Sequence, residues 1–165
     1  MIFHQVPQAS ATLNGQSIAA TNPIVLSNLA EGDYELKVVA LDSAGNQSNV
    51  LTHLFRIDFT KPVIAISAQV VKNPSNEDRN AFAFTASEES TYLCELDGAG
   101  LNACESPILF SGLAEGSHLF RAHAVDLAGN IGADVAYTWN IDTTAPITTV
   151  AATINGDSAK FVVSA

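Results

Sequence analysis

Apolar side chains recur at every second position along much of this chain, which is the pattern of β-strands. Leu36, Val38 and Ala40 alternate with Glu35 and Lys37, as in a strand that buries one face. No stretch keeps the apolar period of an amphipathic helix, so no helix is predicted. Strand patterns return about every ten residues with turn residues between them, and this spacing predicts an all-β sandwich of two sheets.

The pattern is repeated within the chain. The segments 29–62 and 113–146 match without a gap at a distance of 84 residues. Both contain Leu-Ala-Glu-Gly, then Asp-x-Ala-Gly-Asn, then Ile-Asp-x-Thr-x-Pro. A third, partial copy begins after Pro146, where residues 160–165 resemble residues 81–86. Self-similarity at a fixed period indicates an array of like modules.

These copies predict three parts of unequal completeness. Residues 63–146 are expected to form a complete repeat of about seven strands. Residues 1–62 are expected to form a partial repeat that lacks its first strands, because Leu13 of this copy aligns with Leu96 of the complete one. Residues 147–165 then supply the first strands of a third repeat.

The alternation also predicts which residues of the complete repeat face its core. Phe120, Ala122 and Ala124 match the apolar positions of the first copy and are expected to point inward. Trp139 aligns with Phe55 of the first copy. We therefore expect Trp139 in the core rather than on the surface as a platform for sugar.

Composition and charge narrow the class of protein. Hydrophobic residues make up 47% of the chain and charged residues 15%, so the chain is expected to fold. The net charge of −10, with seven Lys and Arg, argues against nucleic acid or an anionic membrane surface as partner. The apolar runs are too short to cross a bilayer, so no membrane insertion is expected. The first seven residues lack the basic start and apolar core of a signal peptide.

Taken in order, the shared phrases resemble the bacterial immunoglobulin-like repeats that occur in tandem in large secreted and cell-surface proteins, many of them adhesins. The resemblance covers one full repeat and parts of two others. It implies tandem immunoglobulin-like β-sandwiches, an extracellular or cell-surface location and a structural or adhesive role. Its implied partners are neighbouring repeats and a ligand on a host or other surface. The competing function is a carbohydrate- or protein-binding accessory module of a secreted enzyme.

Two cysteines lie on either side of an expected hairpin turn. Cys94 and Cys104 flank Asp97 and Gly98, so the two side chains could face each other and form a disulfide. Two buried thiols are the alternative. Zinc is poorly supported, because two cysteines would need two further ligands nearby. The first copy carries neither cysteine, and the bond is therefore expected to be an accessory of one repeat.

Four aspartates recur at matching places in the two copies. Asp42 and Asp126 lie in Asp-x-Ala-Gly-Asn, and Asp58 and Asp142 lie just before the linker prolines. Carboxylates at a domain junction could bind calcium. The alternative is that each carboxylate accepts N–H bonds from its own turn, and the sequence favours it because no dense Asp-x-Asp-x-Asp loop is present. We expect no cofactor, with calcium as the open alternative.

Motifs of catalysis are lacking. Neither Gly-x-Ser-x-Gly nor His-Glu-x-x-His occurs, and no glycine-rich phosphate loop joins a strand to a helix. We therefore expect a protein that is not an enzyme.

The distribution of strands between the ends of the chain suggests assembly. A sandwich without its first strands exposes an apolar face and unpaired edges, and the last residues of the chain would supply the missing strands. The hypothesis is head-to-tail association of copies by strand addition, which would give a filament. The alternative is a fragment of a longer array whose missing strands are adjacent in the parent chain. The expected donor residues are Ile147, Val150, Ile154, Phe161 and Val163.

Overall fold

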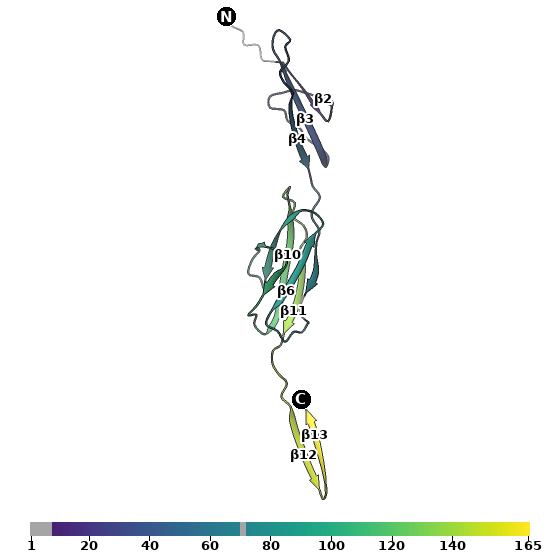
Figure 1. The fold of residues 1–165 in the computed structure, drawn as a ribbon, viewed down its shortest axis with the longest axis vertical. Coiled ribbons are helices and arrows are strands. Elements are labelled where there is room, and N and C mark those ends of the chain that lie inside the picture. Colours follow the sequence, from purple (N-terminus) through teal and green to yellow (C-terminus); the bar gives the residue numbers. More distant parts are fainter. Residues whose placement is uncertain (1–7, 70–71) are drawn as a thin grey trace. The chain divides into compact units, whose positions relative to one another are not determined.

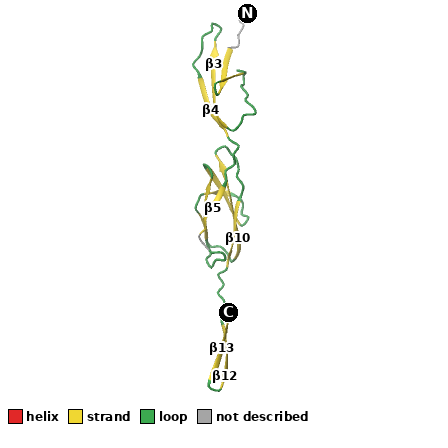
Figure 2. Cartoon of the chain, turned by 90° about the vertical axis from the view of Figure 1, so that its right-hand side faces the viewer, coloured by secondary structure: helices red, strands yellow, loops and turns green. Residues whose placement is uncertain are grey.

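The computed structural model describes residues 8–69 and 72–165. The β-branched segment 63–71 is expected from the sequence to form a strand, and its end lies in the gap. The first seven residues also lie outside the described part. Within the described residues the chain consists of strands and loops without a helix (Figure 2). The chain divides into two compact units, Met1–Thr60 and Lys61–Ala165, and each is described by itself.

The first unit is a single antiparallel sheet with the strand order β2-β1-β3-β4. Its turn between β1 and β2 is formed by Asn14 and Gly15, which both have positive φ (47° and 79°), as a two-residue hairpin requires. Glu35, on the neighbouring strand, donates its backbone N–H to the Asn14 side chain at 2.8 Å. The strands are β1 (Gln8–Leu13), β2 (Gln16–Ile18), β3 (Gly32–Leu41) and β4 (Leu51–Ile57).

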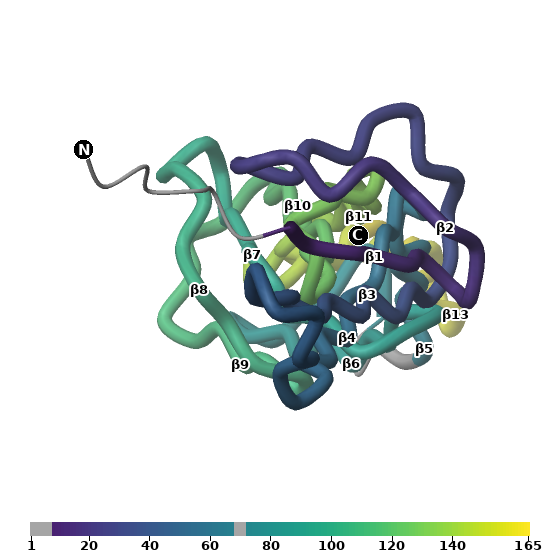
Figure 3. Tube along the Cα trace, turned by 90° about the horizontal axis from the view of Figure 1, so that it is seen from above, coloured from purple at the N-terminus to yellow at the C-terminus, as the bar shows by residue number. Residues whose placement is uncertain are grey.

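The second unit contains a β-sandwich of seven strands, which confirms the predicted fold class. One sheet has the order β11-β10-β7-β8 and the other has the order β5-β6-β9. Seen from above, β5, β6 and β9 lie on one side and β10 and β11 on the other (Figure 3). The strands are β5 (Ile64–Gln69), β6 (Asn80–Ala86), β7 (Ser90–Leu96), β8 (Asn102–Cys104), β9 (Ile108–Phe110), β10 (Gly116–Asp126) and β11 (Val135–Ile141).

The core lies between these two sheets and is aromatic at its centre. The ring of Phe82, from β6, stacks on the ring of Phe120, from β10, with centroids 4.3 Å apart. Trp139 is 1% exposed and packs against Phe82 at 5.3 Å, so its predicted place in the core is confirmed. Ala122 and Ala124 are fully buried, as the alternation predicted. Small residues on β10 leave room for the large rings of the facing sheet.

The sheet of the first unit has the same pairing as one sheet of the sandwich. Its order β2-β1-β3-β4 corresponds to β8-β7-β10-β11. The register agrees: Leu13 pairs with Leu36 as Leu96 pairs with Phe120. The described part of the first unit contains no strand that corresponds to β5 or β6. This unit is therefore one layer of the fold that the second unit builds from two.

The second unit ends in an antiparallel hairpin of two strands, β12 (Thr149–Asn155) and β13 (Ser158–Ser164), drawn in yellow in Figure 1. Every residue of both strands is exposed. Val150 pairs with Val163 as Ile66 pairs with Phe84 in the sandwich. The hairpin thus repeats the first part of the β5–β6 pairing, whereas the bulge that follows Ile66 in the sandwich is missing from the hairpin.

The chain enters the sandwich at one end of β10 and leaves it at the other. At the entering end, a Cβ atom on Gly132 would lie 2.2 Å from the carbonyl oxygen of Pro62, so this close approach requires glycine. At the leaving end, Asp142 donates its backbone N–H to the carbonyl of Ser75 at 2.8 Å. The sandwich is about 26 Å long between these places, judged from eight residues of β10 at a strand rise of about 3.3 Å.

Candidate functional site

The hairpin β12–β13 has one wholly apolar face. Directly paired residues of two strands share a face, and three pairs contribute to this one: Val150 with Val163, Ala152 with Phe161, and Ile154 with Ala159. Phe161 is 64% exposed and Ile154 is 77% exposed. We call these six residues the donor face.

The opposite face of the hairpin is largely polar. It contains the pairs Thr149 with Ser164 and Thr153 with Lys160. A hairpin of only two strands, with one apolar and one polar face, is marginally stable in water. An apolar face of this kind is normally covered by a second layer, as the equivalent face of β5 and β6 is covered in the sandwich.

Four of the five predicted donor residues lie on the donor face. The fifth, Ile147, precedes β12 and is not part of the ladder. Its counterpart in the complete repeat, Val63, is 68% exposed. Ile147 lies outside the ladder because the strand begins only at Thr149.

The sheet of the first unit has a matching uncovered face. Phe120 and Trp139 are buried in the sandwich, but their counterparts Leu36 and Phe55 are only half-buried. Ala40, the counterpart of the fully buried Ala124, is exposed. We call the inward-equivalent side of this sheet the acceptor face, and its residues are Ala11, Leu13, Leu36, Val38, Ala40, Phe55 and Ile57.

One edge segment of the first unit forms no β-ladder with any described residue, although the corresponding segment of the sandwich does. Residues 24–26 correspond to β9, which pairs with β6. Ile24 and Leu26 are half-buried and Val25 is exposed, which is the alternation of Ile108 to Phe110 in β9. The segment has the side-chain pattern of an edge strand without a neighbouring strand.

Two glutamates hold the ends of the repeats in place, and the sequence reasoning missed them. Glu115 accepts hydrogen bonds from the Thr143 backbone at 2.9 Å, from the Thr143 hydroxyl and from the Thr144 hydroxyl at 3.0 Å. These bonds lower the pKa of Glu115 below its ordinary value, with the Thr143 hydroxyl the largest cause. In the first unit Glu31 accepts from the Thr60 hydroxyl at 2.7 Å. The shared phrases Leu-Ala-Glu-Gly and Ile-Asp-x-Thr are therefore two halves of one contact.

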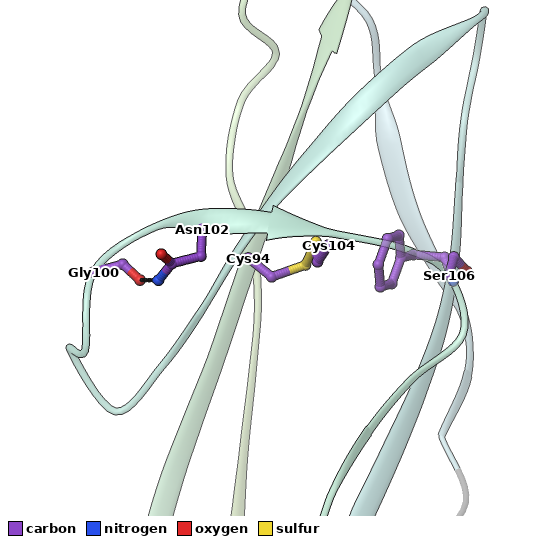
Figure 4. The surroundings of a disulfide bond; sticks show 6 residues. Cys94, Gly100, Asn102, Cys104 and Ser106 are labelled. Carbon is purple, nitrogen blue, oxygen red and sulfur yellow. Dashed lines mark hydrogen bonds between the residues drawn. A yellow bond between two sulfur atoms is a disulfide. The ribbon is translucent and has the colours of Figure 1, made fainter.

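The structure contains the Cys94–Cys104 disulfide that the sequence predicted (Figure 4). The two cysteines are not directly opposite each other: Cys94 pairs with Asn102, and Cys104 pairs with Tyr92. The bond therefore crosses the β7–β8 ladder diagonally, with 5.9 Å between the Cα atoms. At the neighbouring turn, the Asn102 side-chain amide donates to the carbonyl of Gly100 at 2.9 Å (Figure 4).

The carboxylates of Asp42 and Asp126 each accept hydrogen bonds within their own turns. Asp42 accepts from the backbone and the side chain of Asn46, both at 2.8 Å, and these two bonds are the main reason that the pKa of Asp42 is lowered. Asp126 accepts the same two bonds from Asn130. Burial favours the neutral carboxyl of Asp126, but the hydrogen bonds outweigh it and lower its pKa.

The other two aspartates do the same before the linkers. The backbone N–H of Thr60 donates to Asp58 at 3.0 Å, and that of Thr144 donates to Asp142 at 3.1 Å. All four calcium candidates thus accept bonds in the turns where the favoured interpretation put them.

A buried histidine distinguishes the complete repeat from the first unit. His118 contacts the Asp97 carboxylate through Nδ1 at 2.7 Å and the Ala114 carbonyl through Nε2 at 2.9 Å. Burial favours the neutral ring, but both partners are acceptors and together they raise the pKa of His118 above its ordinary value. The first unit has Asn14 and Tyr34 at these two places, and the Tyr34 hydroxyl donates to the carbonyl of Ala30 at 3.0 Å.

No protein-family model matches the chain, and no curated protein does. Among solved structures, the chain is similar to one described as "Structures of Clostridium thermocellum CbhA fibronectin(III)-like modules", with 20% sequence identity and a TM-score of 0.45. The similarity covers 81% of this chain and 76% of that one. The assignment of the fold rests on the sheet order, the register and the buried core, and this likeness adds nothing to it. None of the described residues belongs to a helix long and apolar enough to span a bilayer.

Proposed function

We propose that this chain is a non-enzymatic structural module of a secreted or cell-surface protein, of the adhesin type, built from immunoglobulin-like repeats. In this proposal residues 1–62 are a partial repeat, residues 63–146 are the complete one, and residues 147–165 are the first strands of a third. Copies of the chain associate head to tail, and the hairpin of one copy completes the sheet of the next. Repetition of this contact does not close on itself and gives a filament.

A single observation carries the proposal: the donor face and the acceptor face correspond to the two layers of one sandwich that the same chain already forms. The sandwich shows how β5–β6 covers β7, β10 and β11. The hairpin β12–β13 has the pairing of β5–β6 up to the bulge after Ile66, and β1, β3 and β4 have the pairing of β7, β10 and β11. The donor face is exposed, and the acceptor face is half-buried or exposed except at Ala11, whereas the sandwich buries the centre of both counterparts.

The segments that connect the sandwich to the two uncovered layers are short. Glu115 holds Thr143 and Thr144 at the end where the chain leaves the sandwich, so only residues 145–148 are free before β12. Four residues reach about 14 Å at most. At the other end, Val63 is held by Ser87 and Thr60 by Glu31, which leaves a further two residues, or about 7 Å. These short connections favour contact between copies over closure within one molecule.

The proposal is tested by sedimentation of the full chain over a range of concentrations. The unmodified chain is expected to form oligomers whose mass rises with concentration. Phe161→Ser places a hydroxyl on the donor face and should abolish this association. Val162→Ser is the matched control, because Val162 lies on the same strand and on the opposite face, and it should assemble normally.

Deletion of residues 147–165 should leave a monomer whose sandwich still unfolds cooperatively. An unmodified chain that sediments as a monomer at every concentration would contradict the proposal. So would association that survives Phe161→Ser.

A further inference from the structure

The sandwich offers a template for the contact between two copies at the level of single residues. We propose that β13 of one copy pairs along its free edge with residues 24–26 in the first unit of the next copy, while its other edge stays paired with its own β12. In this register Phe161 lies opposite Ile24, Lys160 opposite Val25 and Ala159 opposite Leu26. This inference rests on the proposed function and specifies the register of its interface. The partner is a second copy of this chain.

The register follows from two correspondences within the molecule. In the sandwich β6 pairs antiparallel with β9, so that Phe82 lies opposite Ile108 and Ala81 opposite Leu109. The hairpin pair Val150 with Val163 corresponds to the pair Ile66 with Phe84 and places Phe161 at the position of Phe82. Residues 24–26 correspond to β9 through the repeat distance of 84 residues.

The side chains of the two surfaces fit this register. Phe82 is fully buried because it packs against Phe120 and Trp139. At the acceptor face the counterparts of these two residues are Leu36 and Phe55, both half-buried. Phe161 would therefore move from water into contact with one aliphatic and one aromatic side chain. A large aromatic side chain that is buried in this way is the usual anchor of a protein interface.

The outer face of the proposed ladder is also consistent. Val25 is 76% exposed, and Lys160 is exposed on the polar side of the hairpin. Their counterparts in the sandwich are Leu109, which is exposed, and Ala81, which is half-buried. The Lys160 ammonium group would remain in water, as a charged side chain must on the outer side of a sheet.

One place in the contact must differ from the template. Ser48 of the first unit corresponds to Gly132, and both donate their backbone N–H to the preceding strand at 2.9 Å. A Cβ atom at Gly132 would lie against the Pro62 carbonyl, but Ser48 has a side chain there. The Pro146 region of the incoming copy must therefore pass farther from the sheet than Pro62 does. Ser48→Gly removes this side chain, together with the hydrogen bond that its hydroxyl accepts from the Ala40 N–H at 3.0 Å, and is expected to tighten association.

The register is tested by disulfide trapping in the full chain. The double variant Val25→Cys with Lys160→Cys places two thiols directly opposite each other at the proposed interface. Under mild oxidation it should give a ladder of covalent oligomers on a non-reducing gel. Val25→Cys with Thr153→Cys is the matched control, because Thr153 is paired with Lys160 on the same face of the hairpin but lies on β12, one strand farther from Val25, and it should give little ladder. Each single variant should stop at a dimer.

The outcomes separate the register from the proposed function. A strong ladder from the control pair and a weak one from the proposed pair would overturn the register, while head-to-tail association would stand. Absence of any ladder, together with sedimentation of the unmodified chain as a monomer, would overturn both. Oligomers of the unmodified chain that neither cysteine pair can trap would overturn the register alone.

Discussion

At the scale of single residues, the two units use different chemistry at the same place. In the sandwich the buried His118 pairs with the partly exposed carboxylate of Asp97, whereas Tyr34 and Asn14 take these positions in the first unit and are neutral. The backbone contact at the turn is kept in both units. Glu35 donates its backbone N–H to the Asn14 side chain, and Leu119 donates its backbone N–H to the Asp97 side chain. The sandwich is therefore expected to respond to pH at a site where the first unit does not.

The pKa of His118 is raised, so its protonated ring stabilises the folded sandwich below the pKa of an unfolded histidine, about 6.5. This stabilisation is lost as the pH rises through the higher folded pKa. The pKa of Asp97 is lowered, so its contribution is lost only as the pH falls through that lower value. Stability should thus decrease as the pH rises from about 6.5 through the folded pKa of His118, by about 1 kcal/mol or less because Asp97 is partly exposed.

The measurement is urea unfolding at pH 6 and pH 9, followed by the fluorescence of Trp139. The double variant Asp97→Asn with His118→Tyr introduces the residues of the first unit and is the control. It should remove the difference between the two pH values that this pair causes. An undiminished difference in the variant would assign the effect to other groups.

At the scale of elements, the disulfide is an addition to a hairpin that can form without it. The first unit builds the same β1–β2 hairpin with Ala11 at the place of Cys94. Closing a loop with a separation of 10 residues stabilises a fold by about 2–3 kcal/mol through loss of entropy in the unfolded chain. We expect reduction to lower the unfolding free energy of the sandwich by that amount without changing its strands.

This is measured by urea unfolding with and without reductant. A variant with Cys94→Ala and Cys104→Ala is the control and should be insensitive to reductant. Circular dichroism of the reduced protein should keep its β signature. Complete unfolding on reduction would show that the bond is required for the fold.

The elements themselves were largely predictable, because strands and turns are encoded locally. The alternation around Phe120 correctly predicted both the strand and its buried face. Contacts between distant residues were not predictable. The Glu115 carboxylate meets Thr143, 28 residues away, and nothing in either phrase alone identifies the other as its partner. Ser75, between β5 and β6, is buried and bridges to Ile141, which depends on how the whole sandwich closes.

At the scale of the whole molecule, a bound calcium ion would make the stability of the protein depend on the calcium concentration around it. All four candidate aspartates accept N–H bonds in their own turns. We therefore expect a chelator to change the melting temperature by less than about 1 °C, since a ligand stabilises a fold only if it binds the folded state. The measurement is a thermal melt with chelator, with added calcium and with neither. A drop of several degrees on chelation would identify a calcium site.

The places where the chain enters and leaves the sandwich also decide how the module carries a load. Tension reaches the sandwich through Pro62 at the start of β5 and through Asp142 after the end of β11, at opposite ends of β10. The force therefore acts parallel to the strands and shears one sheet against the other. The hydrogen bonds and the aromatic core then resist the pull together, whereas a pull on two neighbouring strand ends would open the bonds one after another. A sandwich connected in this way is suited to bear force.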